Sequence, residues 1–218
     1  MRPPEAERGS VKPLPGAEPS QGDVMPRLVD HDERRRAIVA AAWRLLATRG
    51  VDGISMRDLA AEAGYTNGAL SHYFAGKDEI LRTAYEYVIE ATNARIASAT
   101  RRRSGRAALR ALCRELMPMT DEATLEARIA MSLWQRAMTD SVMADVNNAA
   151  VAEWKSQMTQ LWNEAVDAGE LPARDIGVGV ELLMTTIFGL QVTAVLDPVT
   201  TAPADQIRLM DAILDGSS

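Results

Sequence analysis

Apolar residues recur at helical spacing along most of the chain, which is the pattern of packed α-helices. From Asp32 onward, one helix face carries Ile38, Ala42, Leu45 and Leu46. A second and longer apolar stripe begins at residue 80 and comprises Ile80, Leu81, Ala84, Tyr87, Val88 and Ala91. No run of alternating β-branched residues indicates a strand. The pattern therefore predicts an all-α protein.

Two short helices joined by a tight turn are predicted between these long ones. Ser55 and Asp58 form a capping box that begins the first short helix. Gly64 makes the turn, and Thr66 caps a second helix that runs to residue 74. Gly76 ends this helix before the next long helix begins. Together they make a helix-turn-helix unit, whose second helix fits the DNA major groove.

Prolines and glycines divide the chain into three parts. Residues 1–29 hold six of the ten prolines, and such a segment buries too little apolar surface to fold, so we expect a flexible tail. Residues 30–76 form the predicted three-helix helix-turn-helix domain, and residues 77–218 form a larger helical domain, so that about nine helices are expected in all. The later helices are expected at residues 106–117, 122–138, 143–168, 175–196 and 204–214.

Charge is spread unevenly over the 218 residues, whose net charge is -6. That net charge excludes a protein that coats nucleic acid by bulk charge. Between Arg34 and Arg110, however, fourteen basic residues face seven acidic ones, whereas from residue 111 onward six basic residues meet sixteen acidic ones. The basic segment contains the predicted helix-turn-helix unit. Motif and charge therefore both indicate contact with double-stranded DNA.

The residues that build metal and disulfide sites are scarce. One cysteine, Cys113, and two histidines, His31 and His72, cannot make a disulfide within the chain or a His-rich metal site. We therefore expect no metal and no cofactor. The beginning of the chain lacks the apolar segment of a signal peptide, which favours a cytoplasmic protein.

The second short helix has small and polar side chains on its predicted outer face. Leu70 and Phe74 are expected to point inward. The outer positions are then Asn67, Gly68, Ala69, Ser71 and His72. An asparagine is suited to the edge of an adenine in the major groove, and small residues let a helix approach closely. Arg57, Tyr73 and Lys77 are better placed for phosphates, which fix register without reading sequence.

The stretch from Arg34 to Leu81 resembles the DNA-binding domain of the TetR family of transcriptional repressors. The resemblance rests on the spacing from "RDLAAEAGYTNGAL" through "HYF" to Lys77. It implies a homodimer in which a three-helix DNA-binding domain is joined to a larger helical domain that binds an inducer. It places residues 67–73 on the recognition helix and matches Lys77 to a phosphate-contacting lysine. The helix caps Ser55 and Thr66 complete the predicted DNA-binding set.

One branch of that family is more similar than the others. Many relatives have tyrosine where this chain has Ser71, and "GALSHYFAGKDEIL" is instead similar to the branch of the betaine-pathway repressors. The segments "EARIAMSLWQRAM" and "EWKSQMTQLWNEAVDAGEL" resemble the ligand-binding domain of that branch less specifically. The resemblance does not specify choline or betaine as the ligand, because relatives diverge most at the pocket.

Aromatic and methionine residues of the larger domain are candidates for the ligand pocket. Trp154, Met158 and Trp162 share one helix face, although such stripes are usually core packing. The candidate lining comprises Met117, Trp134, Met138, Trp154, Met158, Trp162, Met184, Phe188 and Gln191. A small organic effector of apolar, partly aromatic character is favoured, and a flat cation would stack on a tryptophan face.

The segment 176–196 has about the length and apolar character of a membrane-spanning helix. Glu181, Thr185 and Gln191 interrupt it, and each is unfavourable in lipid, so no membrane contact is expected. With residues 204–214 it would instead form a four-helix dimer seam, as in the family. The recognition helices of the two subunits would then bind half-sites of a near-palindromic operator. The half-sites would be about 34–36 Å apart, or a multiple of that distance. We expect ligand binding to change that spacing through the long helix that begins at Asp78.

Two other classes of function compete with this interpretation. The chain has no G-x-S-x-G, H-E-x-x-H, P-loop or complete G-x-G-x-x-G motif, and Cys113 is far in sequence from both histidines. We therefore expect no enzyme and no catalytic residue. The remaining alternative is a ligand-sensing protein of the same fold that acts as an activator or does not bind DNA.

Overall fold

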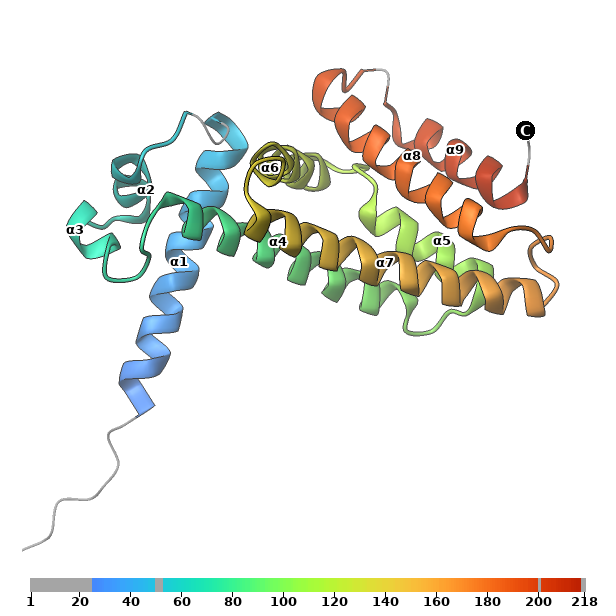
Figure 1. Cartoon of the computed structure of the whole chain (residues 1–218), viewed down its shortest axis with the longest axis horizontal. Coiled ribbons are helices and arrows are strands. Elements are labelled where there is room, and N and C mark those ends of the chain that lie inside the picture. The colour runs from blue at the N-terminus through green and yellow to red at the C-terminus, as the bar shows by residue number, and fades with distance from the viewer. Residues whose placement is uncertain (1–24, 50–52, 200, 217–218) are drawn as a thin grey trace, which may run out of the picture.

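The computed structural model describes residues 25–49, 53–199 and 201–216, and within these ranges every regular element is a helix. The helices are α1 (Met25–Arg49), α2 (Met56–Ala63), α3 (Asn67–Leu70), α4 (Lys77–Thr100), α5 (Gly105–Leu116), α6 (Asp121–Ala137), α7 (Ser141–Asp167), α8 (Ile176–Leu196) and α9 (Pro203–Asp215). Helices α1–α3 lie at one end of an elongated molecule, and α4 runs from them along α7 (Figure 1). The predicted all-α fold is confirmed.

The helix-turn-helix unit forms through the predicted end signals. The Oγ of Ser55 accepts a hydrogen bond from the Asp58 N–H at 3.2 Å, and the Asp58 carboxylate accepts one from the Ser55 N–H at 2.8 Å. Hydrogen bonds from the Ser55 side chain and backbone lower the pKa of Asp58. Gly64 ends α2 at φ 74°, where glycine is unstrained. Thr66 Oγ1 caps α3 by accepting from the Ala69 N–H at 3.2 Å. The capping box and both caps are confirmed.

Two helix boundaries differ from the expected ones. Helix α1 begins at Met25, inside the predicted tail, with Pro26 in the first turn where proline is tolerated; residues 1–24 lie outside the described residues. Helix α3 ends at Leu70 instead of residue 74. Its last residues continue as hydrogen-bonded turns because neighbouring helices bind their backbone groups. Arg35 donates to the Tyr73 carbonyl oxygen, and Glu79 accepts from the Ala75 N–H at 2.7 Å.

One residue of the predicted apolar stripe on α4 is misplaced. Tyr87 is 52% exposed and packs edge-on against Trp43, with 6.4 Å between ring centroids. Tyr85 is buried in its place, and its hydroxyl donates to Asn147 Oδ1 of α7 at 2.8 Å. Tyr85 is buried because it packs with residues of α1 and α6 and bonds to α7, and the spacing of residues on α4 alone does not show these contacts.

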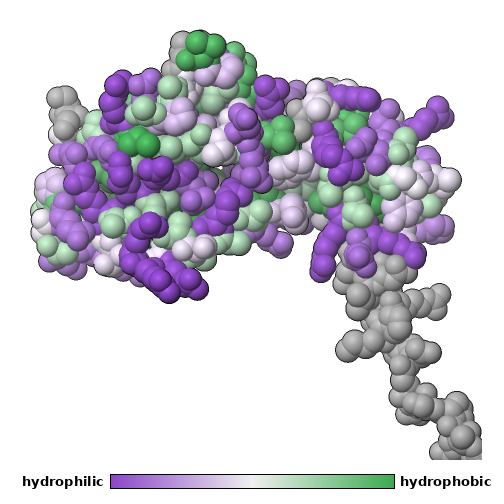
Figure 2. All heavy atoms as spheres, turned by 180° about the vertical axis from the view of Figure 1, so that it is seen from behind, coloured by the Kyte–Doolittle hydropathy of each residue, from purple (hydrophilic) through white to green (hydrophobic). Residues whose placement is uncertain are grey.

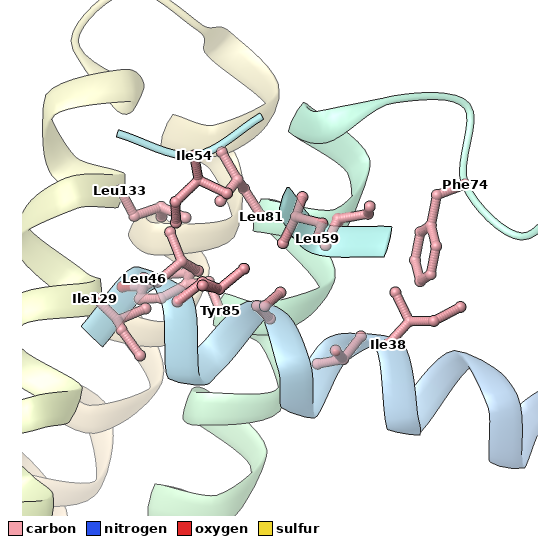
Figure 3. Close-up of a cluster of buried hydrophobic side chains, with 14 of the residues drawn as sticks. Ile38, Leu46, Ile54, Leu59, Phe74, Leu81, Tyr85, Ile129 and Leu133 are labelled. Atoms are coloured by element: carbon pink, nitrogen blue, oxygen red, sulfur yellow. The ribbon is translucent and has the colours of Figure 1, made fainter. Parts of the chain in front are cut away.

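Two apolar cores hold the helices together. The first joins the helix-turn-helix unit to the larger domain, because Ile129 and Leu133 of α6 pack with Leu46, Ile54 and other buried residues of the unit (Figure 3). The second core lies among α5, α7, α8 and α9. The unit is therefore continuous with α6, in addition to being linked through α4.

Helix α8 has one buried face and one exposed face. Among the described residues it is the helix long and apolar enough to cross a membrane. Val180, Leu183 and Ile187 are buried within the second core, whereas Val178 is 55% exposed and Leu182 is 50% exposed. The apolar length of α8 therefore reflects a core face plus an uncovered face.

Candidate functional site

Helix α3 and the turn that follows it present polar side chains to solvent above an apolar layer. Asn67, Ser71 and His72 are exposed, whereas Leu70 and Phe74 are fully buried. The inward orientation of the two apolar residues is confirmed. Gly68 is also exposed and Ala69 is half-buried. The Ser71 Oγ donates to the Asn67 carbonyl oxygen at 3.1 Å, which tethers one polar side chain to the helix itself.

A network centred on Arg35 fixes α3 against its neighbours. The Arg35 guanidinium lies over the Phe74 ring, 4.2 Å from its centroid, and donates to Glu79 Oε1 at 3.2 Å. The hydrogen bond from Ala75 N–H, together with Arg35, lowers the pKa of Glu79. This network joins α1, the turn after α3 and the first turn of α4. The sequence analysis missed Arg35 and Glu79, because nothing in their local pattern shows that they meet.

The remaining predicted DNA-binding residues surround α3. Arg57 is exposed in the first turn of α2, and Lys77 is the first residue of α4. Tyr73 is half-buried, and its hydroxyl accepts a hydrogen bond from Arg34. Ser55 and Thr66 use their hydroxyl groups as helix caps. All ten predicted residues therefore lie between the N-cap of α2 and the first residue of α4, and their roles on DNA remain predictions.

A small, partly open cavity lies between α4, α5, α6, α7 and α8 of the larger domain. Its volume is about 40 Å³, which admits a few water molecules but not an organic ligand without movement of the walls. The lining residues are Tyr85, Val88, Ile89, Thr92, Glu115, Leu116, Ala123, Glu126, Ala127, Ala130, Trp134, Trp154, Phe188 and Gln191. The cavity therefore combines aromatic rings with two carboxylates.

The aromatic side of the cavity is held in place by polar groups on α7. Trp134 meets Phe188 edge-on, with 5.2 Å between ring centroids. The Trp134 Nε1–H donates to Asn147 Oδ1 at 2.9 Å, and the same oxygen accepts from Tyr85. Burial raises the pKa of Tyr85 to about 12, so the phenol is neutral at physiological pH. The rings are therefore fixed without a charge of their own.

Trp154 and Gln191 complete the uncharged part of the lining. The Trp154 Nε1–H donates to Asn93 Oδ1 at 2.7 Å. The Gln191 Nε2–H donates to the Leu116 carbonyl oxygen at 2.9 Å, whereas Gln191 Oε1 is buried with no hydrogen-bond partner among the described residues. A buried acceptor without a partner is unfavourable, so a ligand hydroxyl that donates to Gln191 would stabilise the site.

The acidic side of the cavity carries an ion pair that joins α4 to α6. Glu126 of α6 is 8% exposed, and its two oxygens accept hydrogen bonds from Arg95 of α4 at 2.9 and 2.7 Å. Arg95 also lies 3.4 Å from Glu115 Oε2. The hydrogen bond to Glu126 is the main reason that the pKa of Arg95 is raised. The sequence analysis missed all three residues, because charged positions on a helix usually indicate a solvated face.

The nine predicted ligand-binding residues fall into two groups. Trp134, Trp154, Phe188 and Gln191 line the cavity. The other five do not line it: Met117, Met158, Trp162 and Met184 are buried in the second core, and Met138 is 78% exposed. The stripe from Trp154 to Trp162 leaves the cavity because it follows α7 into that core. There, Trp162 packs against Gly179, where an added Cβ would lie 2.5 Å from the ring.

Metal-binding groups are not assembled in the part of the chain that the structure describes. No three His, Cys, Asp or Glu side chains there are placed to hold a metal ion. Cys113 is fully buried, and burial raises the pKa of its thiol to about 12, so the reactive thiolate is disfavoured. This cysteine is a small core residue.

An exposed polar helix on a helix-turn-helix unit, continuous with a helical domain that contains a cavity, defines a DNA-binding regulator. The model of bacterial regulatory proteins of the tetR family matches residues 38–84, and the model of the BetI-type transcriptional repressor C-terminal domain matches residues 105–217. The chain belongs to the TetR family of transcriptional regulators. Members of this family are DNA-binding regulators, so the chain is not an enzyme.

Individual relatives are similar over most of their length. The HTH-type transcriptional regulator PksA of Bacillus subtilis is 31% identical over 176 residues, which cover 80% of this chain and 85% of the relative. The regulator BetI of Burkholderia ambifaria is 23% identical, covering 75% and 84%. A regulator from Saccharomonospora viridis, crystallised with choline, shares the fold with a TM-score of 0.79 and 22% identity, covering 84% of this chain and 96% of that one.

Proposed function

We propose that the protein is a repressor that binds a near-palindromic operator as a homodimer and is released by a small organic cation. The observation that carries this proposal is that α6 belongs to both functional regions. Glu126 and Trp134 of α6 line the cavity, whereas Ile129 and Leu133 pack on the helix-turn-helix unit. A ligand that moves α6 therefore moves the surface that supports the reading helix.

The coupling uses contacts at both ends of α6. Arg136 in its last turn forms an ion pair with Asp78 in the first turn of α4, next to Lys77. Because the cavity is too small for an organic ligand, binding requires its walls to move, and α4 and α6 contribute nine of the lining residues. A displacement of α4 tilts the helix-turn-helix unit, and the two reading helices of a dimer then no longer match the spacing of the half-sites.

The chemistry of the cavity favours a cation. Tyr85, Trp134, Trp154 and Phe188 present aromatic rings, and the lining contains carboxylates but no lysine or arginine. Aromatic faces and a carboxylate attract a quaternary ammonium group, which has no N–H to hydrogen-bond and so loses less by leaving water than a primary ammonium does. The choline bound by the Saccharomonospora viridis regulator is a ligand of this class. We therefore choose choline as the first effector to test.

The dimer is expected to form through α8 and α9. Val178 and Leu182 are exposed on α8, Leu209 is exposed on α9, and Leu196 and Val199 are exposed at the turn between them. The end of this turn is an apolar projection at the top of the molecule (Figure 2). Exposed apolar side chains along two neighbouring helices are typical of an interface between subunits. Pairing α8 and α9 with their symmetry mates gives a four-helix seam.

On the operator, Asn67, Ser71 and His72 are expected to read base edges, and Gly68 and Ala69 to allow close approach of α3. The exposure of Asn67, Gly68, Ser71 and His72 supports these roles. Arg57, Tyr73 and Lys77 are expected to contact phosphates around α3. The protein would act in the cytoplasm, where the operator DNA lies.

The proposal is tested by selecting bound sequences from random duplex DNA. We expect the selected sites to be near-palindromes, to shift as complexes with two subunits and to be released by choline at moderate salt. A monomer without preference for any duplex would contradict the repressor. Increased transcription when the protein binds its operator would instead support an activator of the same fold. The position of the operator relative to the promoter decides between repression and activation.

A further inference from the structure

We infer that Arg95 is an internal competitor for the effector, bound to the carboxylate that the cationic group of the effector needs. This inference rests on the proposed cation effector. It concerns a residue that does not line the cavity itself, yet controls the charge that the cavity presents.

The carboxylates of Glu115 and Glu126 lie between the cavity and a second, open groove. Glu115, Ala123 and Glu126 line the inner cavity and also line an open groove of about 370 Å³ on its outer side. Arg95 lines the groove and is absent from the cavity lining. The guanidinium therefore binds the outer side of the carboxylates, while the aromatic rings face their inner side. A ligand cation among the rings and the Arg95 guanidinium approach Glu126 from opposite sides.

Glu126 cannot satisfy both cations equally. Its side chain is 10% exposed, and Arg95 occupies both of its oxygens through a bidentate contact. A buried carboxylate requires a partner, so Glu126 holds Arg95 while the cavity is without effector. When a ligand cation arrives, the two positive charges repel at short distance in a region of low dielectric. The carboxylate then exchanges one cation for the other.

The released Arg95 has an alternative position on the same surface. Its side chain is 35% exposed, Glu115 lies 3.4 Å away, and Glu122 lines the same groove. A movement toward these two carboxylates keeps the arginine paired near solvent. Three acidic residues line the groove together with Arg95 and Arg114. Arg95 therefore still has carboxylates nearby when it leaves Glu126.

The exchange also alters a contact between helices. Arg95 belongs to α4 and Glu126 to α6, so the ion pair ties the two helices at the cavity. The effector replaces this tie by contacts of its own and leaves the Arg136–Asp78 pair at the other end of α6. Arg95 therefore weakens effector binding and, by the same pair, holds α4 in its effector-free position.

The test compares choline with its uncharged isostere 3,3-dimethyl-1-butanol on the full-length protein. Binding is measured through the fluorescence of Trp134 and Trp154, which line the cavity. Arg95→Met removes the competing charge and keeps an unbranched apolar side chain. Arg102→Met, at an exposed arginine just after α4, is the matched control. Urea unfolding of each protein shows whether it is folded, and Arg95→Gln replaces Arg95→Met if the methionine variant does not fold.

We expect Arg95→Met to bind choline about tenfold or more tightly than the wild type does, because the ligand no longer displaces a charge-assisted bidentate pair. The affinity for 3,3-dimethyl-1-butanol should be unchanged, and Arg102→Met should change neither. Weaker or unchanged choline binding in Arg95→Met, beside clear binding by the wild type, would overturn the role of Arg95 alone. A similar change for both compounds would show a loosened wall and overturn it too. If no protein binds either compound, the cation effector itself is wrong.

Discussion

The reading helix and the cavity hold their polar groups in opposite ways. On α3 and the turn that follows it, Asn67 and His72 are exposed above a layer of fully buried apolar residues. In the cavity, Glu126 and Tyr85 are themselves buried, and each is bound to a specific partner on another helix. In the first region, the residues expected to bind DNA are different from those that pack the core. In the second region, the residues expected to bind the ligand also hold the helices together. Substitutions on the α3 surface should therefore change DNA binding alone, and substitutions in the cavity should change stability and ligand binding together.

The largest effect is expected beneath the reading helix. Phe74→Ala removes a buried ring and the surface on which Arg35 lies, and should lower the free energy of unfolding by about 3–5 kcal/mol. His72→Ala, on the exposed face, should change it by less than about 0.5 kcal/mol. Urea unfolding measures both. Comparable losses for the two variants would show that α3 does not separate recognition from packing.

The next effect is a loss of stability at alkaline pH that comes from the cavity. Burial raises the pKa of Tyr85 from 10.0 to about 12, so the folded protein holds this proton more tightly than the unfolded chain does. The resulting stabilisation is complete below pH 10 and is lost as the pH rises toward 12, by about 3 kcal/mol in all.

Tyr85→Phe should remove this part of the pH dependence, measured by urea unfolding from neutral to alkaline pH. Cys113 also has a pKa raised to about 12, but it is present in every variant, so the difference from the wild type isolates Tyr85. Tyr87→Phe, at the exposed tyrosine of the same helix, is the matched control and should keep the wild-type slope. Identical slopes in wild type and Tyr85→Phe would contradict the buried phenol.

An intermediate effect is expected on DNA alone. Asn67→Ala should change the preferred base at one operator position by about 1–3 kcal/mol. Lys77→Ala should weaken binding to all sequences alike and reduce the salt slope by about 1. Competition with operator variants at several salt concentrations separates the two. If Lys77→Ala changed sequence preference and Asn67→Ala did not, the assigned roles of reading and positioning would be reversed.

The smallest effect compares the same kind of cap in the two regions. Thr66 caps α3, and Asp140 caps α7 by accepting from the Val142 N–H at 3.0 Å. Alanine at either position should lower the free energy of unfolding by about 1 kcal/mol. Thr66→Ala should in addition weaken operator binding, measured by mobility shift, because it loosens the reading helix. An equal loss of operator affinity in Asp140→Ala would contradict this difference.

The helix-turn-helix unit could be predicted from sequence because its determinants are local. The capping box at Ser55, the turn at Gly64 and the cap at Thr66 each act within a few residues. The inward positions of Leu70 and Phe74 follow from helical spacing. The true end of α3 could not be predicted, because it depends on Glu79 and on Arg35 from a distant helix.

The cavity could be predicted only in part. Trp154 and Trp162 share one face of α7. Trp154, which lies beside α4, lines the cavity, whereas Trp162 packs against α8 in the second core. Glu126 is buried where Arg95 of α4 pairs with it. The surroundings of these residues depend on which helices pack together, and the spacing of residues within one helix does not predict that.

Linkage between the two regions is tested most directly by titrating choline against the free protein and against the protein bound to its selected operator. We expect choline to bind the operator complex about 5- to 150-fold more weakly, and the operator to be weakened by the same factor when choline is bound, since coupling is reciprocal. Equal choline affinity in the free and DNA-bound protein would contradict a regulator whose cavity controls its reading helix.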